Sequence, residues 1–200
     1  LIQAGVTEIS PALHGPTADI HDALTRAPGS FRQTVAGIRV VRSRGLPIVS
    51  NSVVVRDNVE HLVALVGVLG KLGVGQAQLA FVHRVGTAYE LFDRVVPRLS
   101  DVVEPIRACR KIAARYRMRL VTEAIPLCFL RGMEELAVED TIPNTTVIDL
   151  DGMPFDYSMW RPSEGKLHGP PCDACAAKGR CEGPWREYPE RFGWEEFRPL

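Results

Sequence analysis

The chain has 200 residues, 46% of them hydrophobic, and its 24 Lys and Arg residues are balanced by 24 Asp and Glu residues. This length suffices for one domain with a small appended lobe, and the zero formal charge excludes a global basic field for nucleic acid or anionic membranes. No apolar run approaches the roughly 20 residues of a membrane helix, and the N-terminus lacks the order of a secretory signal. We therefore expect a cytoplasmic protein with no nucleic-acid or membrane partner.

Strand-like and helix-like segments alternate along the first two thirds of the chain. Strands are predicted at residues 6–13, 47–55, 77–82 and 119–124, and helices at 30–45, 57–73 and 100–116. Ser30 and Gln33 have the spacing of a capping box at the start of the first of these helices. Such alternation predicts βαβ units with right-handed crossovers, and three units make about half of a β/α barrel. The predicted fold class is α/β, a partial parallel β/α barrel.

Polar residues follow the predicted strands, where a β/α barrel gathers its chemistry. Ser10 and His14 come at or after the end of the first strand. Asn51 interrupts the second strand, although strands of a parallel sheet are normally apolar on both faces. His83 and Gly86 follow the third strand, and Gly86 would let the backbone approach a flat ligand closely. An isolated His more often makes a structural hydrogen bond, and His83 at a strand end has the alternative role of terminating pairing.

Four stretches carry a resemblance to a known family: ISPALHGPTADIHDALTRAPGSF, GLPIVSNSVVVRDNVEHL, AFVHRVGTA and IPLC. Together they resemble the second half of a radical S-adenosylmethionine (radical SAM) enzyme, most clearly in the order S-x-x-x-H-G, H-D, G-S-F. The resemblance implies that Ser10 and Asn51 lie near the ribose and methionine parts of SAM, that His14 contacts cofactor or substrate, and that the turn from His83 to Gly86 contacts adenine.

Two departures from the family pattern limit this expectation. Arg84 stands where many members have a proline in the adenine turn, and the CxxxCxxC loop that holds the catalytic iron–sulfur cluster is absent. We expect that the sequence lacks the first three βα units of the family and that it does not cleave SAM unaided. The missing half would then lie on a separate chain, or the chain is a fragment or a decayed copy.

Three of the five cysteines lie close together in the sequence HGPPCDACAAKGRCEGPW. Cys172 and Cys175 form a C-x2-C pair, and five residues separate Cys175 from Cys181. With this spacing, three thiolates on tight turns can bind one metal centre. Spacing alone suits zinc and an iron–sulfur cluster equally, and His168 is a nearby candidate zinc ligand. A disulfide is the weakest interpretation, because nothing else indicates an oxidising compartment. The resemblance favours an auxiliary 4Fe-4S cluster, as in the SPASM and twitch extensions of radical SAM proteins.

A fourth ligand must come from outside this stretch. Cys109 falls on the apolar stripe of its predicted helix, which favours a buried structural thiol. Cys128 lies just past the last predicted strand, and we expect it to be the fourth ligand. An open site, a substrate ligand, or a purely apolar role for Cys128 remain as alternatives.

The other polar and aromatic groups have simpler interpretations. His21 and Asp22 are expected to cap a helix or form a surface pair, and His61 to face solvent. The acidic run from Glu134 to Asp140 is expected to be a solvated face. The C-terminal aromatic residues are expected to pack the tail over the cysteine segment rather than to stack on bases.

The sequence therefore predicts two domains: residues 1–130 as the C-terminal half of a radical SAM barrel, and residues 131–200 as a small cysteine-rich lobe for the auxiliary cluster. The function implied is that of part of an enzyme that generates a 5'-deoxyadenosyl radical from SAM for hydrogen abstraction from a peptide or small molecule. The rival hypothesis is a non-catalytic β/α scaffold with a structural zinc knuckle. The substrate and the oligomeric state are not encoded in any motif.

Overall fold

The structure, a computed structural model, describes residues 2–83, 86–148 and 152–200. It comprises two compact units, Leu1–Thr122 and Glu123–Leu200. The division into domains at residues 130 and 131, which the sequence suggested, stays a prediction.

Unit 1 is an α/β arrangement on a parallel three-stranded sheet. Its strands are β1 (Val49–Val54), β2 (Gln76–Phe81) and β3 (Arg119–Glu123), in the order β1-β2-β3, with Val49 opposite Gln76. Alternate residues of β1 are fully buried, and the opposite face, which carries Asn51, is partly exposed. The three strands predicted at 47–55, 77–82 and 119–124 are thus confirmed within two residues.

The predicted strand at residues 6–13 is wrong as a regular strand. Residues 6–13 form two isolated parallel bridges to the β1 region of the same chain, Ile9 to Ile48 and Ala12 to Asn51. Pro11 has no N–H to donate to a ladder, and Ser10 between the bridges is exposed. The segment therefore lies along the edge of β1 without continuous pairing.

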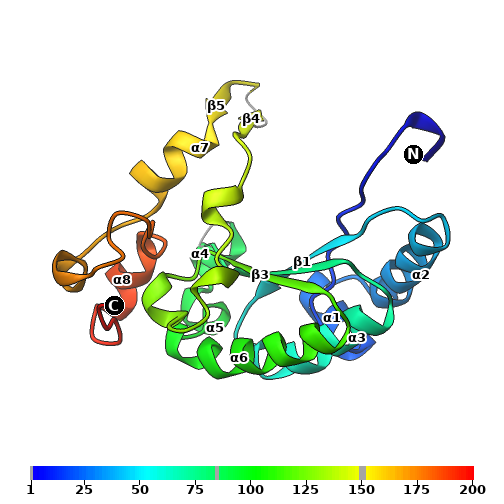
Figure 1. The fold of residues 1–200 in the computed structure, drawn as a ribbon, viewed down its shortest axis with the longest axis horizontal. Helices are drawn as coiled ribbons and strands as arrows, with labels where there is room; N and C mark the ends of the chain where they lie inside the picture. The colour runs from blue at the N-terminus through cyan, green and yellow to red at the C-terminus, as the bar shows by residue number, and fades with distance from the viewer. Residues whose placement is uncertain (1, 84–85, 149–151) are drawn as a thin grey trace. The chain divides into compact units, whose positions relative to one another are not determined.

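Unit 1 contains the helices α1 (Ala18–Thr25), α2 (Ser30–Ser43), α3 (Leu62–Lys71), α4 (Thr87–Glu90), α5 (Phe92–Val95) and α6 (Leu99–Arg115), with 3-10 turns at Ile2–Ala4 and Val59–His61. In Figure 1, α1, α3 and α6 of unit 1 lie below the strands. α3 packs against α6, and Cys109 of α6 is fully buried at that side of the core, as predicted. His61 is exposed, as predicted.

The capping box predicted at Ser30 and Gln33 is wrong, because Asp22 caps α2 instead. The Asp22 carboxylate accepts hydrogen bonds from Gly29 N (2.6 Å), Phe31 N (2.7 Å) and Ser30 Oγ (2.9 Å). These bonds satisfy N–H groups at the start of the helix that have no intrahelical acceptor. The backbone N–H groups of Phe31 and Gly29 also hold the pKa of Asp22 below its usual value.

Replacing Asp22 with alanine should therefore destabilise unit 1. We expect the thermal midpoint followed by circular dichroism to fall by about 2–4 °C at neutral pH. Because the pKa of Asp22 is lowered by folding, its contribution is present above the unfolded-state pKa and is lost as pH falls, so the difference should narrow below about pH 4. Asp19→Ala, at an exposed position of α1, is the control; an equal loss in both variants would contradict the capping role.

Unit 2 has few regular elements after the end of β3. It contains the antiparallel pair β4 (Thr146–Ile148) and β5 (Pro154–Asp156), then α7 (Tyr157–Trp160) and α8 (Glu187–Phe192), with a π-helical turn at Arg161–Gly165. In Figure 1 the β4–β5 hairpin leads directly into α7. Short 3-10 helices lie at Leu127–Phe129, Glu134–Leu136, Glu139–Thr141 and Pro170–Ala174.

Aromatic side chains supply much of the core of unit 2. Phe197 contacts the rings of Phe129 (5.1 Å between centroids), Trp194 (4.8 Å) and Tyr188 (6.2 Å). Offset and edge-to-face ring pairs add to the stabilisation from apolar burial. The expectation that the C-terminal aromatic residues serve for packing is confirmed for these rings.

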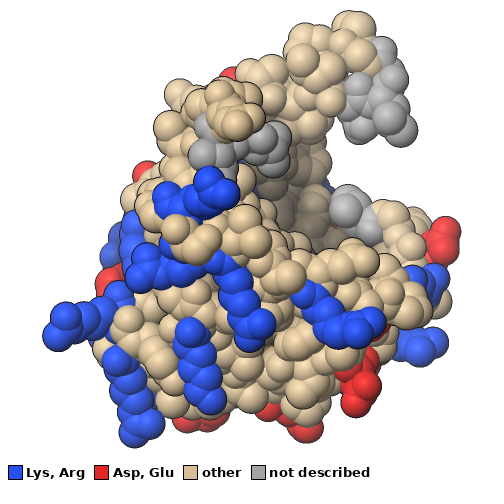
Figure 2. All heavy atoms as spheres, turned by 90° about the vertical axis from the view of Figure 1, so that its right-hand side faces the viewer, with Lys and Arg blue, Asp and Glu red and all other residues tan. Residues whose placement is uncertain are grey.

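The surface carries charges of both signs. Figure 2 shows Lys and Arg side chains spread over one face, with Asp and Glu side chains toward its edges. Within the described ranges, no helix has both the length and the apolar character needed to cross a bilayer.

Candidate functional site

Four of the five cysteines line one small pocket in unit 2. They are Cys128, Cys172, Cys175 and Cys181, and His168 lies at the same pocket. The other lining residues are apolar or small for the most part: Pro126, Ala177, Lys178, Gly183, Pro184 and Phe197. The structure thus brings Cys128, from the turn after β3, to the three cysteines of the C-terminal segment.

Tight turns place the three C-terminal thiols. Pro170 and Pro171 begin a 3-10 helix that contains Cys172, and the N–H of Cys175 returns to the carbonyl of Cys172 at 3.1 Å. A second turn bonds the N–H of Cys181 to the carbonyl of Ala177 at 2.9 Å. Because proline fixes φ near its helical value, the two prolines favour the start of this helix.

Backbone N–H groups point at the sulfur atoms. Gly183 N donates to Cys181 Sγ at 3.4 Å, and Leu200 N donates to Cys175 Sγ at 3.5 Å. Burial, with a smaller contribution from the neighbouring thiols of Cys181, Cys172 and Cys175, raises the pKa of Cys128 to about 12. Metal ligation requires thiolates, so uptake of a metal at this pocket would release protons. N–H donors at sulfur are a setting that favours the thiolate form.

The space between these side chains is about 20 Å³. That volume accommodates about one water molecule, so a multi-iron cluster requires the cysteine side chains to turn away from the centre. Among the residues the structure describes, no group of three or more His, Cys, Asp or Glu side chains is arranged to hold a metal ion.

His168 has a structural partner at the pocket. Its Nε2–H donates to the backbone carbonyl of Cys181 at 2.7 Å, which leaves only Nδ1 for any other ligand. His168 therefore fixes the backbone at Cys181 in this arrangement.

Gly183 gives a test of this local geometry. It has φ +81°, and a Cβ there would collide with the carbonyl oxygen of Leu167, whereas a Cβ at Gly179 meets nothing within 4 Å. We expect Gly183→Ala to lower metal uptake by about tenfold. The alanine cannot adopt the backbone conformation of Gly183 without strain, so the turn that places Cys181 should be distorted. Gly179→Ala is the matched control, and equal uptake by both variants, measured as metal per chain, would show that the turn is not required.

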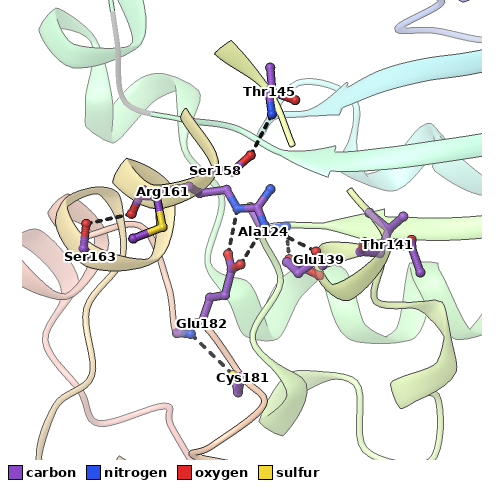
Figure 3. Close-up of polar contacts among 12 residues, drawn as sticks. Ala124, Glu139, Thr141, Thr145, Ser158, Arg161, Ser163, Cys181 and Glu182 are labelled. Carbon is purple, nitrogen blue, oxygen red and sulfur yellow. Dashed lines mark hydrogen bonds and ion pairs between the residues drawn. The ribbon is translucent and has the colours of Figure 1, made fainter. Parts of the chain in front are cut away.

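A group of buried and half-buried charged side chains lies beside the cysteine pocket. Arg161 donates to Glu182 from Nε (2.9 Å) and Nη2 (2.7 Å), and Glu139 Oε1 accepts a bond from Ala124 N at 2.7 Å (Figure 3). Lys166 is 2% exposed, with Nζ 4.0 Å from the ring centroid of Trp185. Burial lowers the pKa of Lys166 to about 8 and raises that of Glu139. The solvated face predicted for the acidic run is therefore wrong at Glu139, and no periodicity or motif in the sequence marks this group.

Unit 1 has a separate cavity of about 430 Å³. It lies beside the carboxyl end of β1, between α1 and the segment that contains α4 and α5. His14, Val53 and Arg94 are among the residues that line it, together with Arg26, Asp57 and Thr87. The size is that of a pocket for a small molecule.

His14 reaches this cavity in a defined protonation state. Its Nδ1 accepts a hydrogen bond from Val53 N at 3.2 Å, which assigns the proton of the neutral ring to Nε2. Burial lowers the pKa of His14, and the stacked ring of His21 lowers it further. His14 is thus a neutral imidazole with an Nε2–H donor.

The other predicted cofactor contacts lie apart from the lining of this cavity. Ser10 is exposed, and Asn51 Oδ1 is buried without a hydrogen-bond partner among the described residues. Gly86 has φ +56°, the positive φ that favours glycine, and His83 is half-buried. Arg84, the departure in the adenine turn, lies outside the described residues, so these roles stay predictions.

Comparison with known proteins adds independent findings. The chain is 27% identical over 169 residues to the AdoMet-dependent heme synthase of Oleidesulfovibrio alaskensis, covering 84% of this chain and 40% of that protein. The enzyme of the same name from Methanosarcina barkeri is 32% identical over 94 residues, 47% of this chain and 27% of that protein. The PqqA peptide cyclase of Ruegeria pomeroyi is 25% identical over 122 residues, 61% of this chain and 33% of that protein.

These relatives are radical SAM enzymes. The resemblance to the radical SAM family is confirmed. No protein-family model matches the chain. The chain spans 40% or less of the length of each of these relatives.

Proposed function

We propose that this chain is the C-terminal part of a radical SAM enzyme and that Cys128, Cys172, Cys175 and Cys181 hold an auxiliary 4Fe-4S cluster. The observation that carries the proposal is the gathering of these four thiols, from two distant segments, around one pocket. Four thiolates are the usual ligand set of such clusters. Unit 2 would then be the cysteine-rich lobe of the enzyme.

The donor chemistry of the pocket fits this group. Cysteine thiolates are soft ligands suited to iron–sulfur clusters and to zinc, and N–H groups directed at the sulfur atoms are a known means of tuning cluster potential. The bonds from Gly183 N and Leu200 N supply such donors. A bound cluster would supply electron transfer or substrate ligation, while this chain holds, orients and partly buries it.

Unit 1 is proposed as part of a β/α barrel that contributes contacts to SAM. Asn51 has a buried Oδ1 without a partner among the described residues, an acceptor suited to a hydroxyl or amino group of a ligand. His14 offers an Nε2–H to the neighbouring cavity. Ser10, His83 and Gly86 complete the proposed cofactor contacts on the strength of the family resemblance.

The overall reaction proposed is hydrogen abstraction from a small molecule or a peptide by a SAM-derived radical. Both substrate classes are represented among the relatives, whose names include a heme synthase and a peptide cyclase. The catalytic CxxxCxxC loop is not in this sequence, so it must come from another part of the polypeptide or from a separate chain.

Anaerobic reconstitution tests the cluster. The protein is purified without oxygen, incubated with iron, sulfide and a reductant, and desalted. We expect brown protein with a broad visible absorption and with iron and acid-labile sulfide in equal amounts. Protein that binds zinc tetrahedrally and contains no inorganic sulfide would instead support the zinc scaffold and overturn the proposal.

A further inference from the structure

The charged group around the buried Arg161 in unit 2 connects to two of the four proposed ligands. We propose that Arg161 is a positioning residue for the candidate metal centre, holding Cys181 through Glu182 and Cys128 through Glu139. This inference rests on the proposed function for the identity of the centre, but the positions of the thiols can be tested without any metal.

A bidentate ion pair between Arg161 and Glu182 provides the link to Cys181. Arg161 is 5% exposed, and its Nε and Nη2 reach the two carboxylate oxygens of Glu182, the residue directly after Cys181 (Figure 3). A planar guanidinium that bonds both oxygens fixes orientation as well as distance. With His168 bonded to the carbonyl of Cys181, the backbone is held on the carboxyl side of this ligand.

The link to Cys128 passes through Glu139. Arg161 Nη2 also donates to the backbone carbonyl of Glu139 at 3.3 Å, and the carboxylate of Glu139 accepts the bond from Ala124 N. Ala124 has φ +61°, a strained value for a residue with a Cβ, and the turn that follows it leads to Cys128. Glu139 thus holds the strained residue at which the chain leaves β3 toward this ligand.

The two linked segments also lie against each other. Pro126 and Leu127, which precede Cys128, line the same small hollow as Cys181 and Glu182. One guanidinium therefore connects the two chain segments that face each other across the pocket.

Stability is a poor explanation for this group. Burying charges costs desolvation free energy, and buried ion pairs can often be replaced by apolar residues without loss. Here two buried cationic atoms, Arg161 Nη1 and Lys166 Nζ, have no hydrogen-bond partner among the described residues. Because burying these cations costs free energy, we explain Arg161 by the positions in which it holds Glu182 and Glu139.

The first arm of the test uses metal-free, reduced protein. Arg161→Met, Arg161→Lys and Glu182→Gln are compared with Glu164→Gln, which alters an exposed carboxylate of the same region that stands 4.0 Å from Arg186. Alkylation rates of each cysteine are read by mass spectrometry. We expect Arg161→Met to speed alkylation of Cys128 and Cys181 by about tenfold, with Cys172 and Cys175 changed less than about twofold.

The charge-preserving variant separates position from charge. Arg161→Lys keeps the positive charge but cannot form the planar fork, so it should fall between wild type and Arg161→Met. Glu164→Gln should match wild type. Unchanged rates in Arg161→Met, or equal acceleration of all four cysteines, would overturn the proposal, the latter because it signals general loosening of unit 2.

The second arm uses reconstituted protein. We expect Arg161→Met to bind iron and sulfide about tenfold more weakly and the reduced centre to give an altered electron paramagnetic resonance spectrum. If wild type itself takes up no iron and sulfide, the cluster assignment fails, while the alkylation arm still decides whether Arg161 positions the thiols. A wild-type spectrum and affinity in Arg161→Met would overturn the positioning role.

Discussion

Replacing Cys172 and Cys175 together with alanine should reduce the iron and sulfide bound after anaerobic reconstitution to less than about a tenth of the wild-type amount. Both thiols belong to the C-x2-C turn, and both line the pocket with Cys128 and Cys181. Because unit 2 has few regular elements, ligation should also contribute to its folding. The variant should therefore lose the rise in unfolding midpoint that reconstitution gives wild type.

The measurements are iron and sulfide per chain, and tryptophan fluorescence during unfolding. Trp160, Trp185 and Trp194 are the three tryptophans of the sequence, and all fall within unit 2, so the signal reports on that unit. Cys109→Ala is the control, since Cys109 is fully buried in α6 of unit 1. Cys128→Ala should lower iron and sulfide as well, and undiminished uptake in that variant would remove Cys128 from the ligand set. Full uptake by the double variant would refute the cluster site altogether.

The second large effect is a pH dependence that depends on Lys166. Burial lowers its folded-state pKa to about 8 from the ordinary 10.5. Between these values the unfolded chain binds more protons than the folded chain, so wild-type stability gains from rising pH. At about 1.4 kcal/mol per pKa unit, the free energy of unfolding of wild type relative to Lys166→Met should rise by about 2–3 kcal/mol from pH 7 to pH 10.

Urea unfolding of the reduced, metal-free proteins, followed by tryptophan fluorescence, measures this difference. Both proteins carry the same cysteines, so thiol titration cancels to a first approximation. Lys178→Met is the control, because the pKa of Lys178 is raised by its exposed pair with Asp173 and its contribution should decline with rising pH. A pH-independent difference between wild type and Lys166→Met would show that the lysine titrates normally in the folded protein.

The sheet strands and the longer helices could be predicted because their signals are local. A β-branched run predicted β1, the repeating alternation of strand-like and helix-like segments predicted β2, and the apolar stripe that includes Cys109 predicted α6. The capping of α2 could not be predicted in this way. Asp22 lies eight residues before Ser30, and only the turn after α1 brings its carboxylate to the N–H groups of α2.

The sequence by itself predicted that the cysteine segment offers thiolate ligands, since C-x2-C-x5-C places three thiols in one turn-rich region. It also determined the family resemblance, because the motifs are contiguous strings of residue types. The tertiary structure alone decided that Cys128 lines the same pocket as those thiols and that Glu139 and Glu182 both bond to the buried Arg161. Contacts between residues far apart in the chain depend on how irregular segments pack, and neither periodicity nor spacing encodes that packing.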